Sequence, residues 1–373
     1  MKNKKKILGI YFLLLVIFSG SYVLARDYKE TFTPTITSTP SNGEKISLLE
    51  GNIYKVASEY YPTSAGKYMG AGDQYAPKEV TIEWECKEQP LYYTVKLAVN
   101  RDLIESQDFV TVDNKIILDT LYSGYHYYYQ IIATYQNKTV KSIIFDFETE
   151  NLPRTIYIEG VSNTRDIGGY YTADGKYRVK QGMIYRGANI DSLSEAAKDS
   201  MLRKYGIKTE LDLKASAGPS PLGETVNFIS VSAPYYALEG GMGIDREDYQ
   251  DALRTEIQAF ANQDNYPIYV HCAIGRDRTG TIAFLINALL GVELKDLQLD
   301  FELSFLSSAG DTGIEPDYYL EGTSAPLNCL YKYLMNYKSG GSLQENTELF
   351  MLDLGITQSE IASIKSIMLE EVQ

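Results

Sequence analysis

The sequence predicts two domains of different fold class: first an all-β sandwich, then an α/β domain with a central parallel sheet and C-terminal helices. Three observations carry this prediction. Apolar and polar residues alternate with a period of two in the first half of the chain; from Thr155 onward short apolar segments alternate with helical patterns; and the C-terminal part reads as helical. These patterns are typical of strands with one solvent-exposed face and of a parallel sheet covered by helices. At 373 residues the chain is also too long for one ordinary domain.

Residues 1–25 have the pattern of a secretory signal peptide. Lysines at the start precede an apolar run over residues 7–18, and Val23-Leu24-Ala25 forms the end of the signal-like segment before Arg26. If the segment is not cleaved, it is just long enough to remain as a membrane anchor. We therefore expect a protein that is secreted or anchored at the outer face of a membrane.

A linker is expected over residues 26–45, because residues 31–43 are mostly Ser, Thr and Pro and hold few apolar side chains. The sandwich is expected over residues 46–150. Its clearest strand carries Val80, Ile82 and Trp84 in alternation with polar neighbours. Further strands are expected at residues 94–99, 116–118, 127–135 and 142–149.

The α/β domain is expected over residues 151–373, with helix starts at Ser192-Leu193-Ser194-Glu195 and Thr357-Gln358-Ser359-Glu360. The chain has three cysteines. The only disulfide compatible with a free Cys272 would join Cys86 to Cys329. We expect both to be free, because Cys86 lies on the core face of a strand and Cys329 in an apolar helix.

The run from His271 to Gly280 is the strongest indication of chemistry. Residues 266–270 read as a buried strand and residues 279–290 as an apolar helix, so the run is a loop between a strand end and a helix start. Backbone N–H groups there can converge on one point, where the positive helix end favours an anion. The expected phosphate-binding residues are Ala273, Ile274, Gly275, Arg276, Asp277 and Arg278.

Cys272 and Arg278 supply the reactive groups of that loop. The field of the loop and Arg278 stabilise the Cys272 thiolate, which can attack phosphorus while the planar Arg278 guanidinium holds two phosphate oxygens. His271 and Thr279 are expected to support the loop, and Thr279 could ease the release of the sulfur. This chemistry needs no metal or other cofactor. The alternatives are a chance meeting of a buried cysteine with a surface arginine, and a rhodanese-like sulfur-transfer loop, in which the arginine usually falls closer to the cysteine.

His271-Cys272-x5-Arg278-Thr279 resembles the signature of cysteine-dependent tyrosine phosphatases. Residues 275–280 resemble the Gly-Lys-Asp-Arg-Thr-Gly form of the bacterial tyrosine phosphatases with broad phosphoprotein and phosphoinositide activity. Residues 163–170, Asn-Thr-Arg-Asp-Ile-Gly-Gly-Tyr, are similar to their Asn-Phe-Arg-Asp-Leu-Gly-Gly-Tyr motif. The resemblance spans roughly residues 155–370 and implies hydrolysis of phosphotyrosine, with phosphoserine, phosphothreonine and phosphoinositides as further candidate substrates. Residues 163–169 could equally form a structural turn tied by an Arg165–Asp166 network.

The general acid is open among three carboxylates, because the chain has no Trp-Pro-Asp loop: its sole tryptophan is Trp84. The resemblance implies Asp277, inside the loop. Asp245, beside a glycine-rich stretch, is the second choice, and its structural alternative is a helix N-cap. Asp212, at the end of a predicted strand, is the third. Arg276 stands where the family usually has lysine, which leaves open whether it reaches a second phosphate.

The formal charge of −14 argues against nucleic acid and against adsorption to a membrane surface. It favours a phosphorylated protein or a small phosphate monoester as partner. Leu121 followed by Tyr127 resembles the tyrosine corner of fibronectin type III sandwiches, which implies a module for a cell-surface ligand or a spacer. The alternatives to a protein tyrosine phosphatase are an inositol-phosphate phosphatase and a non-catalytic, phosphate-recognising surface-binding protein.

Overall fold

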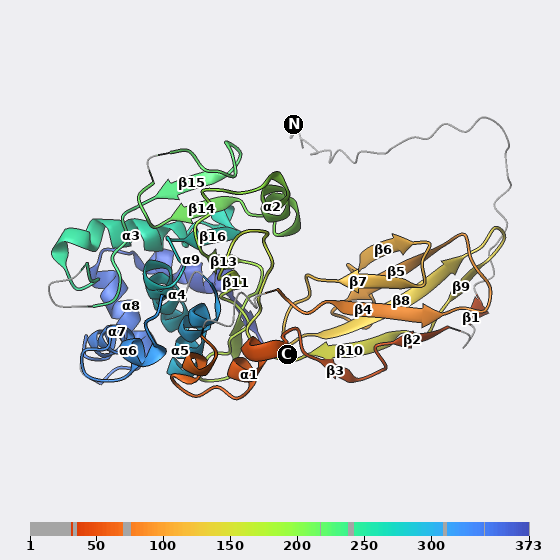
Figure 1. Ribbon diagram of the computed structural model, residues 1–373, viewed down its shortest axis with the longest axis horizontal. Helices are drawn as coiled ribbons and strands as arrows, with labels where there is room; N and C mark the ends of the chain where they lie inside the picture. The colour runs from red at the N-terminus through yellow and green to blue at the C-terminus, as the bar shows by residue number, and fades with distance from the viewer. Residues whose placement is uncertain are drawn as a thin grey trace, which may run out of the picture.

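The computed structural model describes residues 31–32, 36–69, 76–216, 218–237, 242–308, 312–338 and 340–372. The predicted leader over residues 1–25 lies outside this part of the chain. An all-β module and an α/β module follow one another along the long axis of the molecule (Figure 1). Within the described residues, no helix has the length and apolar character needed to cross a membrane.

Two sheets form the all-β module and enclose one apolar core. In the larger sheet β8 pairs with β5, β9 and β10, and in the smaller one β4 lies between β2 and β7. Val80, Ile82 and Trp84 point into the core, as their alternation predicts. The strands are β1 (Thr31–Phe32), β2 (Thr37–Thr39), β3 (Glu44–Ile46), β4 (Val80–Glu85), β5 (Tyr92–Ala98), β6 (Gln107–Thr111), β7 (Lys115–Leu118), β8 (His126–Thr134), β9 (Thr139–Lys141) and β10 (Phe145–Thr149).

The predicted Ser/Thr/Pro linker differs from the structure. β2 pairs with β4, β3 pairs with β10, and Ile36 is buried in the core of the module. Every residue except proline carries a backbone N–H and C=O whatever its side chain, so a segment with few apolar residues can still add a strand to a sheet edge. Composition alone therefore failed to identify these edge strands.

The α/β module is built on a five-stranded sheet in the order β11-β13-β16-β14-β15, in which the last four strands are parallel and β11 is antiparallel. A separate pair joins β12 and β17. The strands are β11 (Arg165–Asp166), β12 (Tyr177–Val179), β13 (Ile184–Gly187), β14 (Thr209–Asp212), β15 (Asn227–Ser230), β16 (Ile268–His271) and β17 (Leu369–Glu371). The predicted parallel sheet is present.

Helices cover both faces of this sheet. On one face Ala197 of α2 and Met201 pack with Tyr269; on the other, the larger core contains Ile268 and Val270 of β16 and the apolar faces of the remaining long helices. The helices of the module are α2 (Glu195–Asp199), α3 (Gln250–Ala259), α4 (Asp277–Leu289), α5 (Leu294–Leu303), α6 (Pro316–Leu320), α7 (Pro326–Met335), α8 (Leu343–Asp353) and α9 (Gln358–Met368).

The predicted caps are partly right. Thr357 and Glu360 form the expected capping box at the start of α9. At α2 the cap is Ser194, whose hydroxyl accepts from the Ala197 N–H, and not Ser192.

A segment inserted in the sandwich belongs physically to the α/β module. Helix α1 (Gly51–Ser58) lies between β3 and β4 in sequence, yet Ile53 and Val56 are buried in the larger core of the α/β module. The 3-10 turn η1 (Ser64–Tyr68) follows. Strands alone were expected over this stretch. The helical spacing of Ile53, Val56 and Ala57 was the signal that could have identified α1.

Glu302 of α5 fixes this inserted segment. Its carboxylate accepts hydrogen bonds from the Tyr60 hydroxyl at 2.7 Å, the Thr63 N–H at 2.7 Å and the Ala65 N–H at 3.2 Å. Arg154 makes a second connection: it donates to the Leu121 carbonyl and forms an ion pair of 2.9 Å with Asp166. The two modules are therefore joined by buried polar contacts as well as by apolar packing.

Candidate active site

The loop from Cys272 to Arg276 joins the end of β16 to the start of α4, as the sequence predicts. Gly275 has φ +72°, and a Cβ there would lie 2.3 Å from the Gly187 carbonyl oxygen. Glycine is therefore required both by the backbone conformation and by the close approach of β13. This tight turn curls the loop over the N-terminal end of α4.

Side chains from outside the loop hold its carbonyl groups. The Asn189 amide donates to the Ala273 carbonyl at 3.1 Å, Asn163 to the Ile274 carbonyl at 2.9 Å, and Arg186 to the Gly275 carbonyl at 2.7 Å. The N–H groups of Ala273, Ile274 and Gly275 donate to no acceptor in the described part of the chain. With the carbonyls held outward, these N–H groups are available to an anion inside the loop.

Asp300 of α5 anchors the arginines that support the loop. It pairs with Arg165 at 2.8 Å and also with Arg186, and all three side chains are buried. Burial alone would raise the pKa of Asp300, but the two guanidinium groups outweigh it and lower that pKa below its ordinary value. Asn163, Arg165 and Asp166 are buried and absent from the lining of the cleft, so this motif acts as scaffold; Arg165 pairs with Asp300 rather than Asp166.

A cleft of about 450 Å³ opens over the loop. Cys272, Asp277 and Arg278 all contribute to its lining, together with Ala273 and Ile274. The rest of its wall is aromatic and apolar: Tyr235, Tyr236, Tyr318, Tyr319 and Pro326. Sequence reasoning missed these four tyrosines, because they come from two segments that only the fold brings together.

Asp277 is the candidate acid that faces this cleft. The Tyr236 hydroxyl donates to its Oδ1 at 2.7 Å, and burial followed by the nearby Asp277 charge raises the pKa of Tyr236 well above its ordinary value. The Oδ2 of Asp277 accepts no hydrogen bond from the described residues. One oxygen is thus held in place and the other is open to a substrate.

The other two candidate acids lie elsewhere. Asp212 is buried at the end of β14, where it accepts hydrogen bonds from the Lys214 N–H and the Ser216 hydroxyl. Asp245 is exposed, and neither residue lines the cleft. Asp245 does not cap α3 either, because that helix begins at Gln250 after a 3-10 turn over Glu247–Tyr249.

Arg276 turns away from the cleft. It is 3% exposed, its guanidinium lies over the rings of Phe305 and Tyr319, and it donates to the Tyr319 hydroxyl at 2.8 Å and the Thr312 hydroxyl at 3.1 Å. Reaching a second phosphate would break these contacts. The side chain instead ties the loop to α6, which carries Tyr318 and Tyr319.

His271 and Thr279 flank the loop from within the protein. Both are buried. His271 Nε2 lies 2.9 Å from Glu210 Oε1, and the Thr279 hydroxyl has no hydrogen-bond partner in the part of the chain that the structure describes. Glu210, Asp212 and His271 bring ligand atoms within 4.8 Å of one another, but Ser220 and Ser216 already donate to the two carboxylates. All three cysteines are free, as expected.

A cysteine in an anion-binding loop at a strand–helix junction, with an arginine six residues on, defines the class of cysteine-dependent phosphatases. A sequence model described as the tyrosine phosphatase family matches residues 156–370. The chain belongs to this family, which is a family of phosphatase enzymes.

Among the relatives is a protein of Cupriavidus necator named as a tyrosine-protein phosphatase. The two are 32% identical over an alignment of 168 residues, and the match covers 38% of this chain and 59% of that protein. The match thus spans less than two thirds of the relative's length.

The solved structures that match include the following two. The core catalytic domain of the PP-IP phosphatase SIW14 from S. cerevisiae, in complex with citrate, has a TM-score of 0.27 and 20% identity and covers 37% of this chain and 78% of that one. The chicken CNTN1 FN1-FN3 domains have a TM-score of 0.18 and 10% identity and cover 41% of this chain and 46% of that one. At these TM-scores neither match adds to the family assignment.

Proposed function

We propose that this protein is an exported phosphatase that hydrolyses phosphotyrosine through a phosphocysteine intermediate. The observation that carries the proposal is that Cys272, Asp277 and Arg278 share one cleft above a loop with unpaired N–H groups. Export is proposed from the signal-like segment over residues 1–25.

In the first step the Cys272 thiolate attacks phosphorus. The S–P bond forms as the P–O ester bond breaks, and the leaving phenolate takes the proton of the Asp277 carboxylic acid. The Arg278 guanidinium and the loop N–H groups stabilise the charge that develops on the phosphoryl oxygens.

In the second step water attacks phosphorus and gives up a proton to the Asp277 carboxylate. The S–P bond breaks, inorganic phosphate leaves and the Cys272 thiolate is restored. The buried Thr279 hydroxyl, to which no described residue is hydrogen-bonded, is a candidate donor to the departing sulfur. No metal or other cofactor enters either step.

The substrate is proposed to be an aryl ester with a single phosphate. Tyr235, Tyr236, Tyr318 and Tyr319 give the cleft walls that suit an aromatic ring. Arg278 is the arginine that lines the cleft, since Arg276 is engaged with Phe305 and Tyr319. A second or third phosphate would therefore meet little positive charge, which favours phosphotyrosine over inositol polyphosphates.

The sandwich is proposed to be a fibronectin type III-like module. The Tyr122 N–H donates to the Tyr127 hydroxyl at 2.7 Å, a contact of the tyrosine-corner kind. Its buried contacts with the α/β module support a role in positioning that module, beside the proposed role as a spacer or a binder of a cell-surface ligand.

The mechanism is tested with Cys272→Ser in the full chain. We expect para-nitrophenyl phosphate turnover to disappear while binding of vanadate or inorganic phosphate persists. Rapid denaturation of the wild type during turnover of an aryl phosphate radiolabelled at phosphorus should trap protein-bound phosphate that the variant lacks. Turnover retained by the variant would overturn the proposal.

Substrate class is tested with a panel of phosphotyrosine, phosphoserine and phosphothreonine peptides, inositol polyphosphates and phosphoinositide vesicles. We expect the highest kcat/KM for phosphotyrosine peptides. A preference for inositol polyphosphates would instead assign the inositol-phosphate alternative. Phosphate binding without turnover of any member would assign the non-catalytic alternative.

A further inference from the structure

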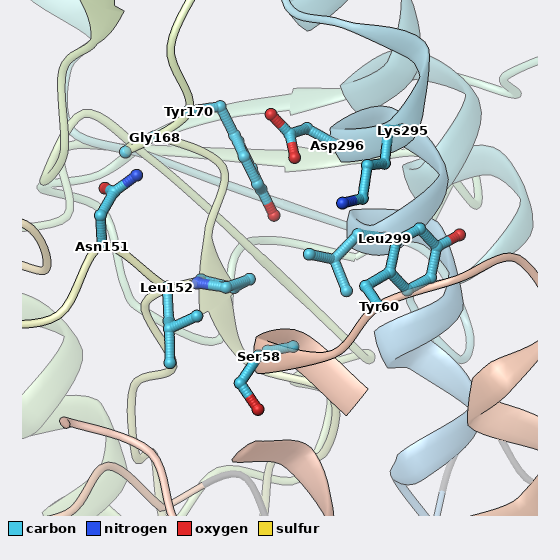
Figure 2. A pocket seen from close by; sticks show the side chains of 12 residues that line it. Ser58, Tyr60, Asn151, Leu152, Gly168, Tyr170, Lys295, Asp296 and Leu299 are labelled. Carbon is cyan, nitrogen blue, oxygen red and sulfur yellow. The ribbon is translucent and has the colours of Figure 1, made fainter. Parts of the chain in front are cut away.

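A cavity of about 110 Å³ lies where the inserted segment of the sandwich meets the α/β module. The end of α1, the connection between the modules, the loop after β11 and the first turns of α5 line it (Figure 2). It shares no lining residue with the active-site cleft. The chemistry described above therefore does not account for it.

Tyr170 points an unpaired hydroxyl into this cavity. Tyr170 is 7% exposed, yet its hydroxyl has no hydrogen-bond partner among the described residues, and Figure 2 shows it directed at the open space. Leaving a buried hydroxyl without a partner costs free energy, so such groups in folded proteins usually have a protein, water or ligand partner. The hydroxyl is free to meet a ligand here.

Lys295 and Asp296 line the same cavity with opposite charges that do not pair. Within the described residues neither side chain makes a hydrogen bond or an ion pair. Figure 2 shows the Lys295 amino group directed toward the Tyr170 hydroxyl and the Asp296 carboxylate beside the Tyr170 ring. Burial, with a smaller contribution from Glu293, raises the pKa of Asp296, and Lys295 offsets this only in part. Asp296 is thus a partly dehydrated carboxylate without a direct counter-ion.

We infer that this cavity binds a small zwitterion of the α-amino acid type, such as glycine or alanine. The ligand ammonium would pair with Asp296, and the ligand carboxylate would accept from Lys295 and the Tyr170 hydroxyl. A ligand with both charges satisfies all three groups at once, whereas a simple cation or anion leaves one of them unpaired. The cavity volume suits a ligand of this size.

The site also connects parts of the molecule that the ligand would hold together. Tyr60, beside the cavity, belongs to the inserted segment, whereas Asp296 belongs to α5, whose Asp300 anchors the arginines under the catalytic loop. A bound zwitterion would therefore stabilise the docked arrangement of the two modules. Because a ligand that binds only the folded protein stabilises it, binding should raise the unfolding temperature.

The test is calorimetric titration and thermal unfolding of the full chain with glycine and alanine, compared with methylammonium, acetate and inorganic phosphate. We expect saturable binding of the amino acids, a matching rise in unfolding temperature, and weaker effects of the three singly functional ions. Tyr170→Phe and Asp296→Asn should each weaken binding by about tenfold or more. Asp264→Asn, which removes an exposed carboxylate that does not line the cavity, should leave binding unchanged.

Three outcomes would overturn the inference. The first is that neither amino acid binds saturably, and the second is that both variants bind them like the wild type. The third is that phosphate binds as well as alanine and binds Asp296→Asn more tightly, which would assign an anion site. Tyr170→Phe keeps the ring in place, so it decides the matter if Asp296→Asn does not fold. None of these readouts depends on catalysis, so they stand apart from the proposed phosphatase activity.

Discussion

The Tyr236 hydroxyl donates a hydrogen bond of 2.7 Å to Asp277 Oδ1, and both residues line the cleft above Cys272. This contact comes from a loop far from Asp277 in sequence. It holds Oδ1 of the carboxyl group, while Oδ2 accepts no hydrogen bond from the described residues. The proposed acid role of Asp277 therefore depends on a residue that no local motif identifies.

For Asp277→Asn we expect a loss that depends on the leaving group. Hydrolysis of phenyl phosphate should slow by about 10²- to 10⁴-fold, because its phenolate needs a proton. Hydrolysis of para-nitrophenyl phosphate should slow much less. Steady-state kinetics with both esters measure this difference, and equal losses for the two would argue against an acid role.

Tyr236→Phe should lower phenyl phosphate turnover by about tenfold, because Asp277 loses its orienting donor. The double variant should be no slower than Asp277→Asn alone, since both changes act on one group. Tyr177→Phe, on an exposed tyrosine of β12, is the control and should behave as the wild type. Additive losses in the double variant would show that Tyr236 acts independently.

Asp300→Asn should destabilise the protein by about 3–5 kcal/mol at pH 7, because it leaves the buried guanidinium groups of Arg165 and Arg186 without a counter-charge. The pKa of Asp300 is lowered in the folded state, so its charge stabilises the fold fully above about pH 5, and this contribution is lost as the pH falls toward the folded value. The gap between wild type and variant in urea unfolding should narrow below pH 4. Asp264→Asn, at an exposed site, is the control; a pH-independent gap would contradict the assignment.

Gly275→Ala should abolish turnover and weaken vanadate binding, because the new Cβ would collide with the Gly187 carbonyl and displace the loop. Gly175→Ala is the matched control: its φ of +68° imposes similar backbone strain, but nothing lies within 4 Å of the added Cβ. That variant should lose some stability and keep its activity. If both variants were equally active, the loop would not depend on the close approach of β13.

Removal of the sandwich with its inserted segment should destabilise the remaining residues 150–373. Ile53 and Val56 are each 1% exposed within the larger core, and burying such a side chain is worth about 1.5–3 kcal/mol. Differential scanning calorimetry should show a lower unfolding temperature for the fragment than for the full chain. Glu302→Gln in the full chain should also lower the unfolding temperature, because the substitution weakens three hydrogen bonds. A fragment as stable as the full chain would contradict this.

The order and type of the main elements, and the position of the loop after β16, follow from local pattern. Strand alternation, the apolar helix after Thr279 and the glycine at position 275 are all encoded within a few residues of where they act. Local pattern does not show which residues distant in sequence a side chain will contact. The contacts of Asp300, of Tyr236 and of the buried face of α1 are of this long-range kind.

For Arg276, local pattern suggested a contact with substrate that the fold does not provide. Its position in the loop indicates a charge available to substrate, whereas its aromatic partners Phe305 and Tyr319 follow at a distance in sequence and make it structural. The edge strands at residues 37–46 were missed for a related reason: backbone pairing depends on a neighbouring edge and leaves little trace in composition.

The placement of α1 within the β3–β4 connection has a consequence for how this architecture can be inherited. Because α1 of the all-β module packs in the core of the α/β module, the all-β module cannot be exchanged for another sandwich by simple recombination near residue 150. Any ancestor in which the two were independent would have had to gain that helix, and descendants that lose the sandwich would need a substitute for it. The two modules are thus expected to be inherited together.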